Sequence, residues 1–303
     1  MTLLSRTGRA LRTALRAPAT ALLCGLVLLG LTTAWGMSAA SATGSQWTID
    51  GSYAFNGNGW TGTLAVTGAE SGWPGVTMTY DERGVTEYLT GTWNPVTGTL
   101  TIYRPLQGGA TQSYTLYLGD HDPGSPVFGG YFTESDTGAM RYGAFADDYL
   151  PAHTARAAAR SLHTAEGLTL APMPGSPTTI TRARPDTGAP LDPIGGYYGF
   201  DGNGWDGHLV VWPALCVTPD TQVQMEYTEL GRAEDIAVPV WVPATGTLTL
   251  VRALAGGVTQ TYTLYLGNHR PDDLMFGGYF TQSDVPGMRY AAYAYHLPGG
   301  VGC

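Results

Sequence analysis

The chain contains two copies of one segment, and this repeat restricts the possible folds more than any other feature. Residues 49–146 align with 194–294 along almost their whole length. Each copy holds a YxFxGNGW segment, followed by TGTLT, TQxYTLYLG and FGGYF in the same order. A unit of about a hundred residues is too long for a solenoid repeat and has the size of a domain. We therefore expect two tandem domains of one fold, repeat 1 over residues 43–148 and repeat 2 over 194–303.

The first 42 residues have the pattern of a secretory signal peptide. Four arginines precede an apolar run from Ala19 to Ala34, and the small residues Ala40, Ser41 and Ala42 follow. This order of basic, apolar and small residues predicts export, with cleavage after Ala42 and a secreted mature protein. An uncleaved membrane anchor is the alternative interpretation.

The charge balance argues against anionic partners. The chain has a formal net charge of −9, and cleavage would remove four arginines and no acidic residue, which lowers the charge to −13. A surface this acidic repels nucleic acid and anionic membranes, so we expect neither as a partner. All fifteen basic residues are arginine. Together with the abundant Ala and Gly, this bias is typical of a GC-rich bacterial genome.

Two cysteines would remain after cleavage, Cys216 and Cys303, and both belong to repeat 2. In an exported protein, an even pair is more typical of a disulfide than of a metal site. We therefore predict a Cys216–Cys303 disulfide that ties the C-terminal tail to a loop. Two thiols without clustered His or acidic residues are too few for zinc, so we expect no metal.

Repeat 1 alternates apolar and polar residues in short runs that Gly, Pro, Asn and Asp interrupt. A period of two with tight turns predicts β-strands joined as an antiparallel up-and-down meander. One strand face carries large apolar side chains. The other is mostly Thr and Ser, which suit a solvated face. The predicted strands are 49–56, 59–67, 75–81, 86–93, 97–104, 110–119, 126–133 and 138–147.

One core face, one wet face and eight meandering strands favour a barrel, because closure removes unpaired edges. The predicted fold is therefore all-β, with two tandem eight-stranded antiparallel up-and-down barrels. A flattened β-sandwich is the structural alternative. With fragments such as YLTGTW and FGGYF, each copy resembles the avidin and lipocalin type of barrel in strand number and order. This resemblance implies an architecture and assigns no ligand.

Residues 149–193 separate the two predicted barrels. The segment 153–167 is typical of a short helix that ends at a glycine. Residues 168–193 contain six prolines and predict an extended linker. The outer face of repeat 2 is more apolar than that of repeat 1, as Ile236, Tyr265 and Tyr293 illustrate. Such a face usually marks a contact surface, and we expect it to pack on the other barrel or on the linker.

The odd-numbered turns of an eight-stranded meander share one end of the barrel, and polar residues gather there. By the strand alternation, Arg104 and Gln112 point into repeat 1 just below this mouth, and Arg252 and Gln260 do so in repeat 2. We predict a ligand site in which Arg and Gln bind polar groups while Trp or Tyr packs on apolar ones. The predicted ligand-binding residues are Arg104, Gln112, Asn58, Asp136, Arg252, Gln260, Asn203 and Asp284.

A purely structural role is the alternative for these mouths. Arg and Gln can cap a barrel end, while Asn and Asp serve the turns. Moreover, an eight-stranded barrel can be filled by its own side chains. These two interpretations stay open at the level of sequence.

Neither a catalytic set nor a cofactor motif recurs in both copies. His121 and His269 lie in matching loops that we place at the end of each barrel opposite the mouth, so the partners of a Ser–His–acid set would lie across the barrel. Arg141 and Arg289 are expected to pair with a nearby acid or to stack on an aromatic ring. The GNGW segment lies between strands and not before a helix, so it is no phosphate loop. We expect no cofactor.

Together these observations predict a secreted, non-enzymatic two-domain protein that binds a small polar or amphipathic ligand such as a sugar. A structural or protein-interaction module with filled barrels is the first alternative. A secreted hydrolase is the second.

Overall fold

A computed structural model describes residues 49–119, 126–138, 140–147, 192–212, 222–236, 239–270 and 273–297. Both repeats belong to one compact unit, Ala40–Cys303. The predicted signal peptide, almost all of the predicted helix and linker over 149–193, the disulfide cysteines Cys216 and Cys303, and His121 lie outside the described residues.

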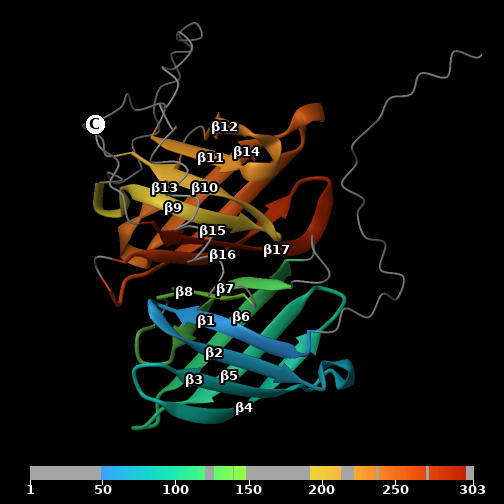
Figure 1. Cartoon of the computed structure of the whole chain (residues 1–303), viewed down its shortest axis with the longest axis vertical. Coiled ribbons are helices and arrows are strands. Elements are labelled where there is room, and N and C mark those ends of the chain that lie inside the picture. The colour runs from blue at the N-terminus through green and yellow to red at the C-terminus, as the bar shows by residue number, and fades with distance from the viewer. Residues whose placement is uncertain are drawn as a thin grey trace, which may run out of the picture. The chain divides into compact units, whose positions relative to one another are not determined.

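Repeat 1 is a closed barrel of eight antiparallel strands, in which each strand pairs with its neighbours in sequence and β8 closes on β1 (Figure 1). The first hairpin turns at Asn58 and Gly59, whose φ angles of 58° and 90° suit the Asn-Gly turn of a two-residue hairpin. The strands are β1 Gly51–Gly57, β2 Trp60–Thr67, β3 Gly75–Tyr80, β4 Val85–Asn94, β5 Thr99–Pro105, β6 Thr111–Gly119, β7 Val127–Glu134 and β8 Tyr142–Asp147.

The alternation of the sequence decides which side chains fill this barrel. Inward residues such as Phe55, Leu100 and Phe128 are fully buried, whereas the outward threonines of β4 are exposed. The aromatic rings inside meet mostly edge to face, as Tyr53 and Phe128 do at 5.3 Å between centroids. The all-β prediction and the meander order are therefore confirmed.

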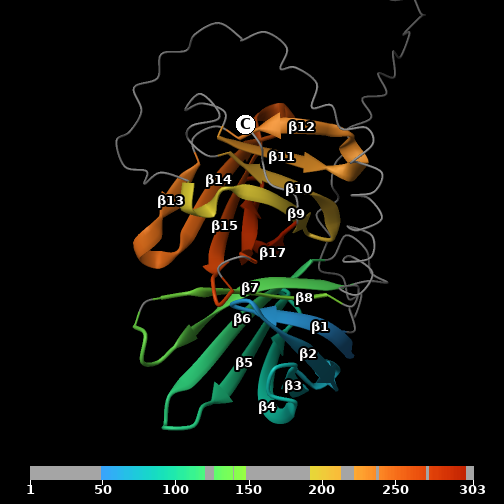
Figure 2. The same cartoon turned by 60° about the vertical axis from the view of Figure 1, so that its left-hand side comes forward.

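Repeat 2 keeps this order but is a nine-stranded curled sheet that stays open between β12 and β13 (Figure 2). Repeat 2 has nine strands and not the expected eight, because the counterpart of β4 is divided into two strands. Its strands are β9 Gly196–Gly202, β10 Trp205–Val211, β11 Val223–Tyr227, β12 Arg232–Asp235, β13 Val240–Val242, β14 Thr247–Ala253, β15 Thr259–Gly267, β16 Met275–Gln282 and β17 Val285–His296.

The sequence explains why the second sheet opens at this strand. In repeat 1 the first half of β4 pairs with β3 and the second half with β5, so one unbroken strand closes the barrel. Between Glu234 and Trp241 the second copy is one residue longer than between Glu87 and Trp93, and it contains Pro239. Proline cannot donate a ladder hydrogen bond and is disfavoured inside a sheet. The two halves therefore become β12, which pairs with β11, and β13, which pairs with β14.

The repeats contact each other through β6–β8 of repeat 1 and β15–β17 of repeat 2. Phe145 and Tyr293 occupy equivalent positions and stack on each other, with 4.4 Å between centroids and 8° between planes. The pairs Tyr117–Tyr279 and Tyr131–Tyr265 are each 4.9 Å apart. The two tyrosine pairs are equivalent, because Tyr265 matches Tyr117 and Tyr279 matches Tyr131 in the repeat. The contact is thus a pseudo-two-fold one, as in an isologous dimer.

Small residues in the two FGGYF segments let the backbones approach at this contact. A Cβ atom on Gly129 would lie 2.6 Å from the backbone nitrogen of Ala292, and one on Gly277 would lie 2.3 Å from that of Ala144. Glycine therefore fits at both positions, whereas alanine would force the repeats apart.

Two arginines expected to face outward lie at the same contact. Arg141 lies 5.0 Å from the ring of Tyr131 and 5.6 Å from that of Tyr265, so tyrosines from both repeats hold its guanidinium. Arg289 lies in the same way on Tyr279 and Tyr117. Of the outer apolar residues of repeat 2, Tyr265 and Tyr293 are buried here. The prediction that Ile236 faces outward was wrong, because its side chain is buried in the core of repeat 2.

Candidate functional site

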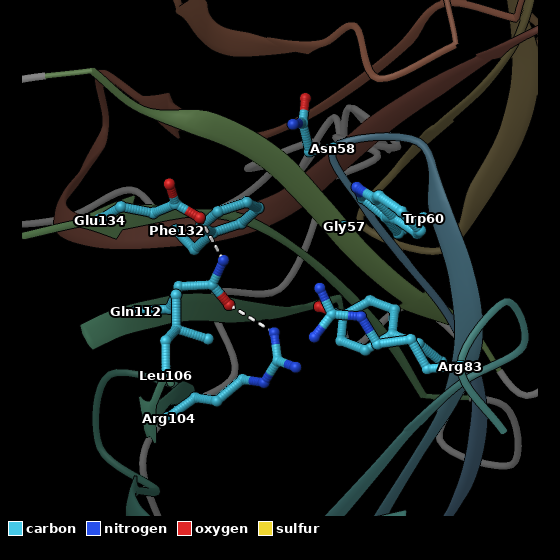
Figure 3. Close-up of a pocket in the computed structure, with 10 residues that line it drawn as sticks. Gly57, Asn58, Trp60, Arg83, Arg104, Leu106, Gln112, Phe132 and Glu134 are labelled. Carbon is cyan, nitrogen blue, oxygen red and sulfur yellow. Dashed lines mark hydrogen bonds between the residues drawn. The ribbon is translucent and has the colours of Figure 1, made fainter. Parts of the chain in front are cut away.

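The four odd-numbered turns of repeat 1 converge on one end of the barrel and surround a pocket of about 140 Å³. Figure 3 shows Arg104, Gln112 and Glu134 along one side of it, with Trp60 and Arg83 across from them. The residues that line it are Gly57, Asn58, Trp60, Tyr80, Arg83, Arg104, Leu106, Gln112, Phe132 and Glu134.

Strand pairing places the two residues at the floor of this pocket. Arg104 near the end of β5 lies directly opposite Gln112 near the start of β6. Both share the inward parity of Leu100, Ile102 and Tyr114, so a cation and an amide enter the barrel together. Both side chains are buried.

The cation is balanced by an acid inside the same barrel. Arg104 donates from Nε and Nη2 to the two carboxylate oxygens of Glu87, both at 2.6 Å. This hydrogen bond lowers the pKa of Glu87. Burial opposes the charge of Arg104, but the hydrogen bond to Glu87 and the electrostatic interactions with Tyr80, Tyr114 and Glu87 together outweigh it and raise the pKa of Arg104. The pair is therefore ionised at neutral pH, and most of the donors of Arg104 are already engaged.

Gln112 connects this ion pair to the rest of the floor. Its Oε1 accepts from Arg104 Nη1 and from the Tyr114 hydroxyl, both at 2.8 Å, and its Nε2 donates to Glu134. The hydroxyls of Tyr114 and Tyr80 are 2.7 Å apart. Burial raises the pKa of Tyr80 and that of Tyr114. Both phenols therefore stay neutral, and the network seals the barrel below the pocket.

The side chains of the rim are more exposed than those of the floor. Trp60 forms one wall, and the carboxylate of Glu134 is only partly buried. The guanidinium of Arg83 lies 5.9 Å from the Trp60 ring. A carboxylate, a guanidinium and an indole thus face the pocket, a combination that can hold a polar ring-shaped molecule.

Repeat 2 reproduces the floor. Arg252 donates to Glu234 at 2.6 Å from Nε and to Gln260 at 3.2 Å. Gln260 accepts from Tyr262, whose pKa burial raises to about 12. The hydroxyls of Tyr262 and Tyr227 are again 2.7 Å apart.

The two rims differ in charge. Gln282 replaces Glu134, and it accepts from Gln260 at 2.9 Å while donating to Asp284 at 2.8 Å. Leu230 stands where repeat 1 has Arg83. The acid and the base that face the pocket of repeat 1 are therefore both absent from the matching positions of repeat 2.

The structure brings together most of the predicted site residues of repeat 1. Arg104, Gln112 and Asn58 line the pocket, whereas Asp136 is exposed and does not line it. In repeat 2, Arg252 and Gln260 are buried on the floor, Asn203 is buried in the first turn and Asp284 is bonded to Gln282.

Sequence reasoning missed Glu87 and Glu234, the partners of the two buried arginines. A signal for Glu87 was present, because it shares the parity of Leu89 and Trp93, which the alternation places inward. An acid at an inward position of one strand and an arginine at an inward position of the next predict a buried ion pair.

The other unforeseen feature comes from the neighbouring repeat. His269 stacks on Trp60 with 3.6 Å between centroids, and the backbone N–H groups of Asn268 and His269 donate to Asn58 at 2.9 Å. Arg270 pairs with Glu82 on the third turn of repeat 1. Within its own repeat this loop lies away from the mouth, but packing of the repeats brings it to the mouth of repeat 1.

No protein-family model matches this chain, and no curated protein is similar to it at a significant level. None of the helices in the described part of the chain is long and apolar enough to cross a membrane. Among the described residues, no three His, Cys, Asp or Glu side chains are grouped as ligands of a metal ion.

Proposed function

We propose that the chain is a non-enzymatic binding protein whose first repeat holds a small, hydroxyl-bearing ligand in the mouth pocket. The observation that carries this proposal is the convergence of four turns on a pocket of about 140 Å³ with Trp60, Arg83 and Glu134 at its rim. A single sugar ring is the ligand class that we favour. Repeat 2 would then support the mouth by contributing the loop that contains His269.

The size of the pocket limits the ligand. A cavity of about 150 Å³ accommodates a six-membered ring such as benzene, so one pyranose ring is near the upper limit here. Drug-sized ligands occupy pockets of about 300–1,000 Å³ and would not fit inside. A larger molecule could place only one ring in this pocket.

The chemistry of the rim favours hydroxyl groups. Glu134 can accept from a sugar hydroxyl, and Arg83 can donate to one. The floor contributes less than the sequence predicted, because Arg104 is already bonded to Glu87 and Gln112. The rim residues, and not the buried arginine, are therefore the ones that would decide affinity.

The test replaces rim residues of repeat 1 with the residues that repeat 2 has at the matching positions. Glu134→Gln and Arg83→Leu give repeat 1 the rim of repeat 2 without disturbing the ion pair. We expect calorimetric titration of residues 43–303 with a panel of neutral monosaccharides to find one ligand, and each variant to weaken it at least about tenfold, or 1.4 kcal/mol. Asp136→Asn, outside the pocket, is the control. Unchanged affinity in both rim variants would overturn the assignment.

A structural or protein-interaction module is the second candidate, because the network below the pocket closes the interior of both repeats. The absence of any monosaccharide response would favour it over the binding protein.

Export and the disulfide remain part of the proposal. Expression of the whole chain in a secreting bacterium should release a protein that begins after Ala42, as intact mass measurement would show. A Cys216–Cys303 bond would lower that mass by two hydrogens relative to the reduced form. Retention of the first 42 residues would contradict cleavage.

A further inference from the structure

The outer face of β3–β5 in repeat 1 has an unusual composition. The outward positions of these three strands hold threonine, tyrosine, asparagine, proline and Gly75. None of these outward residues is charged. The chain as a whole has a formal net charge of −9. A neutral face on such an acidic protein offers nothing to an ionic partner and suits an uncharged one.

Three large aromatic side chains rise from this face. The exposed fractions are 75% for Trp73, 50% for Tyr103 and 86% for Tyr88. Soluble proteins rarely gather exposed large apolar side chains without a contact that uses them. We call Trp73, Tyr88 and Tyr103 the aromatic strip.

Strand register orders the strip along β4. The Trp93 N–H donates to the Gly72 carbonyl at 3.0 Å, which holds Trp73, just before β3 begins, beside the C-terminal end of β4. Tyr103 lies opposite Thr90, and Tyr88 is two residues further along β4. Tyr103 and Tyr88 therefore belong to successive rows, about 6.6 Å apart along β4, and Trp73 lies beyond Tyr103 at the end of that strand.

This spacing points to a chain of rings. One face of a pyranose ring presents C–H groups that pack on an aromatic ring, and its hydroxyls reach the polar side chains alongside. Here the threonines between the aromatic rings supply those partners. Tyrosine and tryptophan suit such a contact because each combines a large apolar face with a polar edge.

We propose that the aromatic strip binds a neutral polysaccharide chain along the outside of repeat 1. This site is separate from the mouth pocket, because its residues have the opposite strand parity and face away from the barrel interior. It also stands without the proposed function, since no residue of the strip lines the pocket.

Repeat 2 provides the internal comparison. Asp235 stands in place of Tyr88 and Val251 in place of Tyr103, and the counterpart of β4 is interrupted between β12 and β13. Repeat 2 therefore lacks two rings of the strip as well as the continuous strand that carries it.

The test is affinity electrophoresis of residues 43–303 in native gels that contain hydroxyethyl cellulose, mixed-linkage β-glucan, glucomannan or, as the acidic comparison, polygalacturonate. We expect retardation by at least one neutral polymer that persists in 0.5 M salt, because uncharged contacts are not screened. Trp73→Ala, Tyr88→Asp and Tyr103→Val should each reduce retardation at least about fivefold. All three side chains are exposed, and circular dichroism would verify the fold of each variant.

The controls separate this site from the mouth. Glu134→Gln and Val251→Ala should leave retardation unchanged. Loss of retardation in Glu134→Gln alone would assign polymer binding to the mouth and overturn the strip. Retardation by polygalacturonate alone, retardation by none of the polymers, or retardation of all three strip variants equal to that of the wild type would also overturn it.

Discussion

Repeat 1 and repeat 2 share one internal network but present different surfaces. The buried Arg–Glu pair, the glutamine and the two joined tyrosine hydroxyls occur in both, with the same inward parity. The rim residues Glu134 and Arg83 and the outer Tyr88 occur only in repeat 1. The network that both copies share is explained by its contribution to the stability of the fold. The residues found only in repeat 1 are the better candidates for a specific function.

The largest expected effect concerns the shared network. Arg104→Met and Arg252→Met should each destabilise the protein by about 3–5 kcal/mol, because each leaves a carboxylate without its buried partner. Urea unfolding followed by tryptophan fluorescence measures this loss. Arg232→Met is the matched control, since Arg232 also bonds to Glu234 but is 74% exposed, and surface pairs contribute about 0–1 kcal/mol. A cost below 1 kcal/mol for Arg104→Met would show that the pair is not structural.

The contact between the repeats gives the next effect. Gly129→Ala places a methyl group against the backbone of Ala292 and Gly278, and overpacking of this kind costs about 1–3 kcal/mol. Small-angle X-ray scattering should show the repeats moving apart. Gly75→Ala is the comparison, because its nearest neighbour would be the movable hydroxyl of Thr67 at 3.1 Å. Identical scattering for Gly129→Ala and the wild type would contradict the tight contact.

Acid should weaken the shared network in both repeats. The hydrogen bond to Arg104 lowers the pKa of Glu87, and that to Arg252 lowers the pKa of Glu234. The resulting stability is present above the ordinary pKa of 4.5 and is lost as the pH falls through the lower folded-state pKa. Glu87→Gln should cost about 1.5–3 kcal/mol at pH 7.

Below pH 4 the stability difference between Glu87→Gln and the wild type should narrow, as denaturant unfolding across pH would show. Glu70→Gln, at an exposed position, is the control for the change of an acid to its amide. A constant difference for Glu87→Gln from pH 7 to pH 3 would contradict the ion pair.

The smallest effect on stability belongs to the outer face. Tyr88→Asp introduces the residue of repeat 2 at a site that is 86% exposed, so the free energy of unfolding should change by less than about 0.5 kcal/mol. Thermal unfolding measures it, with Val96→Ala as a second exposed position. A loss above 1 kcal/mol would mean that Tyr88 supports the fold and is not available for a ligand.

Much of the fold could be predicted from the sequence, because apolar and polar residues alternate along each strand and so identify its inner and outer faces. That pattern placed Phe55 and Leu100 inside, and it aimed Arg104 and Gln112 at the same mouth. Strand continuity was harder to predict, since one added residue and Pro239 divide the counterpart of β4 while leaving the apolar pattern intact.

Contacts between the repeats could not be derived from either repeat alone. Alternation marks Tyr117, Phe145 and Tyr293 as outward, but it does not say that they face each other. The position of His269 on Trp60 depends on that packing, and so does the engagement of Asn58. The ion pair of Arg104 with Glu87 is different, because strand parity alone points the acid on β4 and the arginine on β5 into the same barrel.

The repeats share a structural floor, and we propose that only repeat 1 has a binding mouth. This proposal is tested by an NMR titration of residues 43–303 with monosaccharides, in which the indole N–H signals of Trp60 and Trp205 are assigned by Trp→Phe variants. We predict that a ligand shifts the Trp60 signal and leaves that of Trp205 in place. Equal shifts of both signals, or a shift of Trp205 alone, would contradict the account.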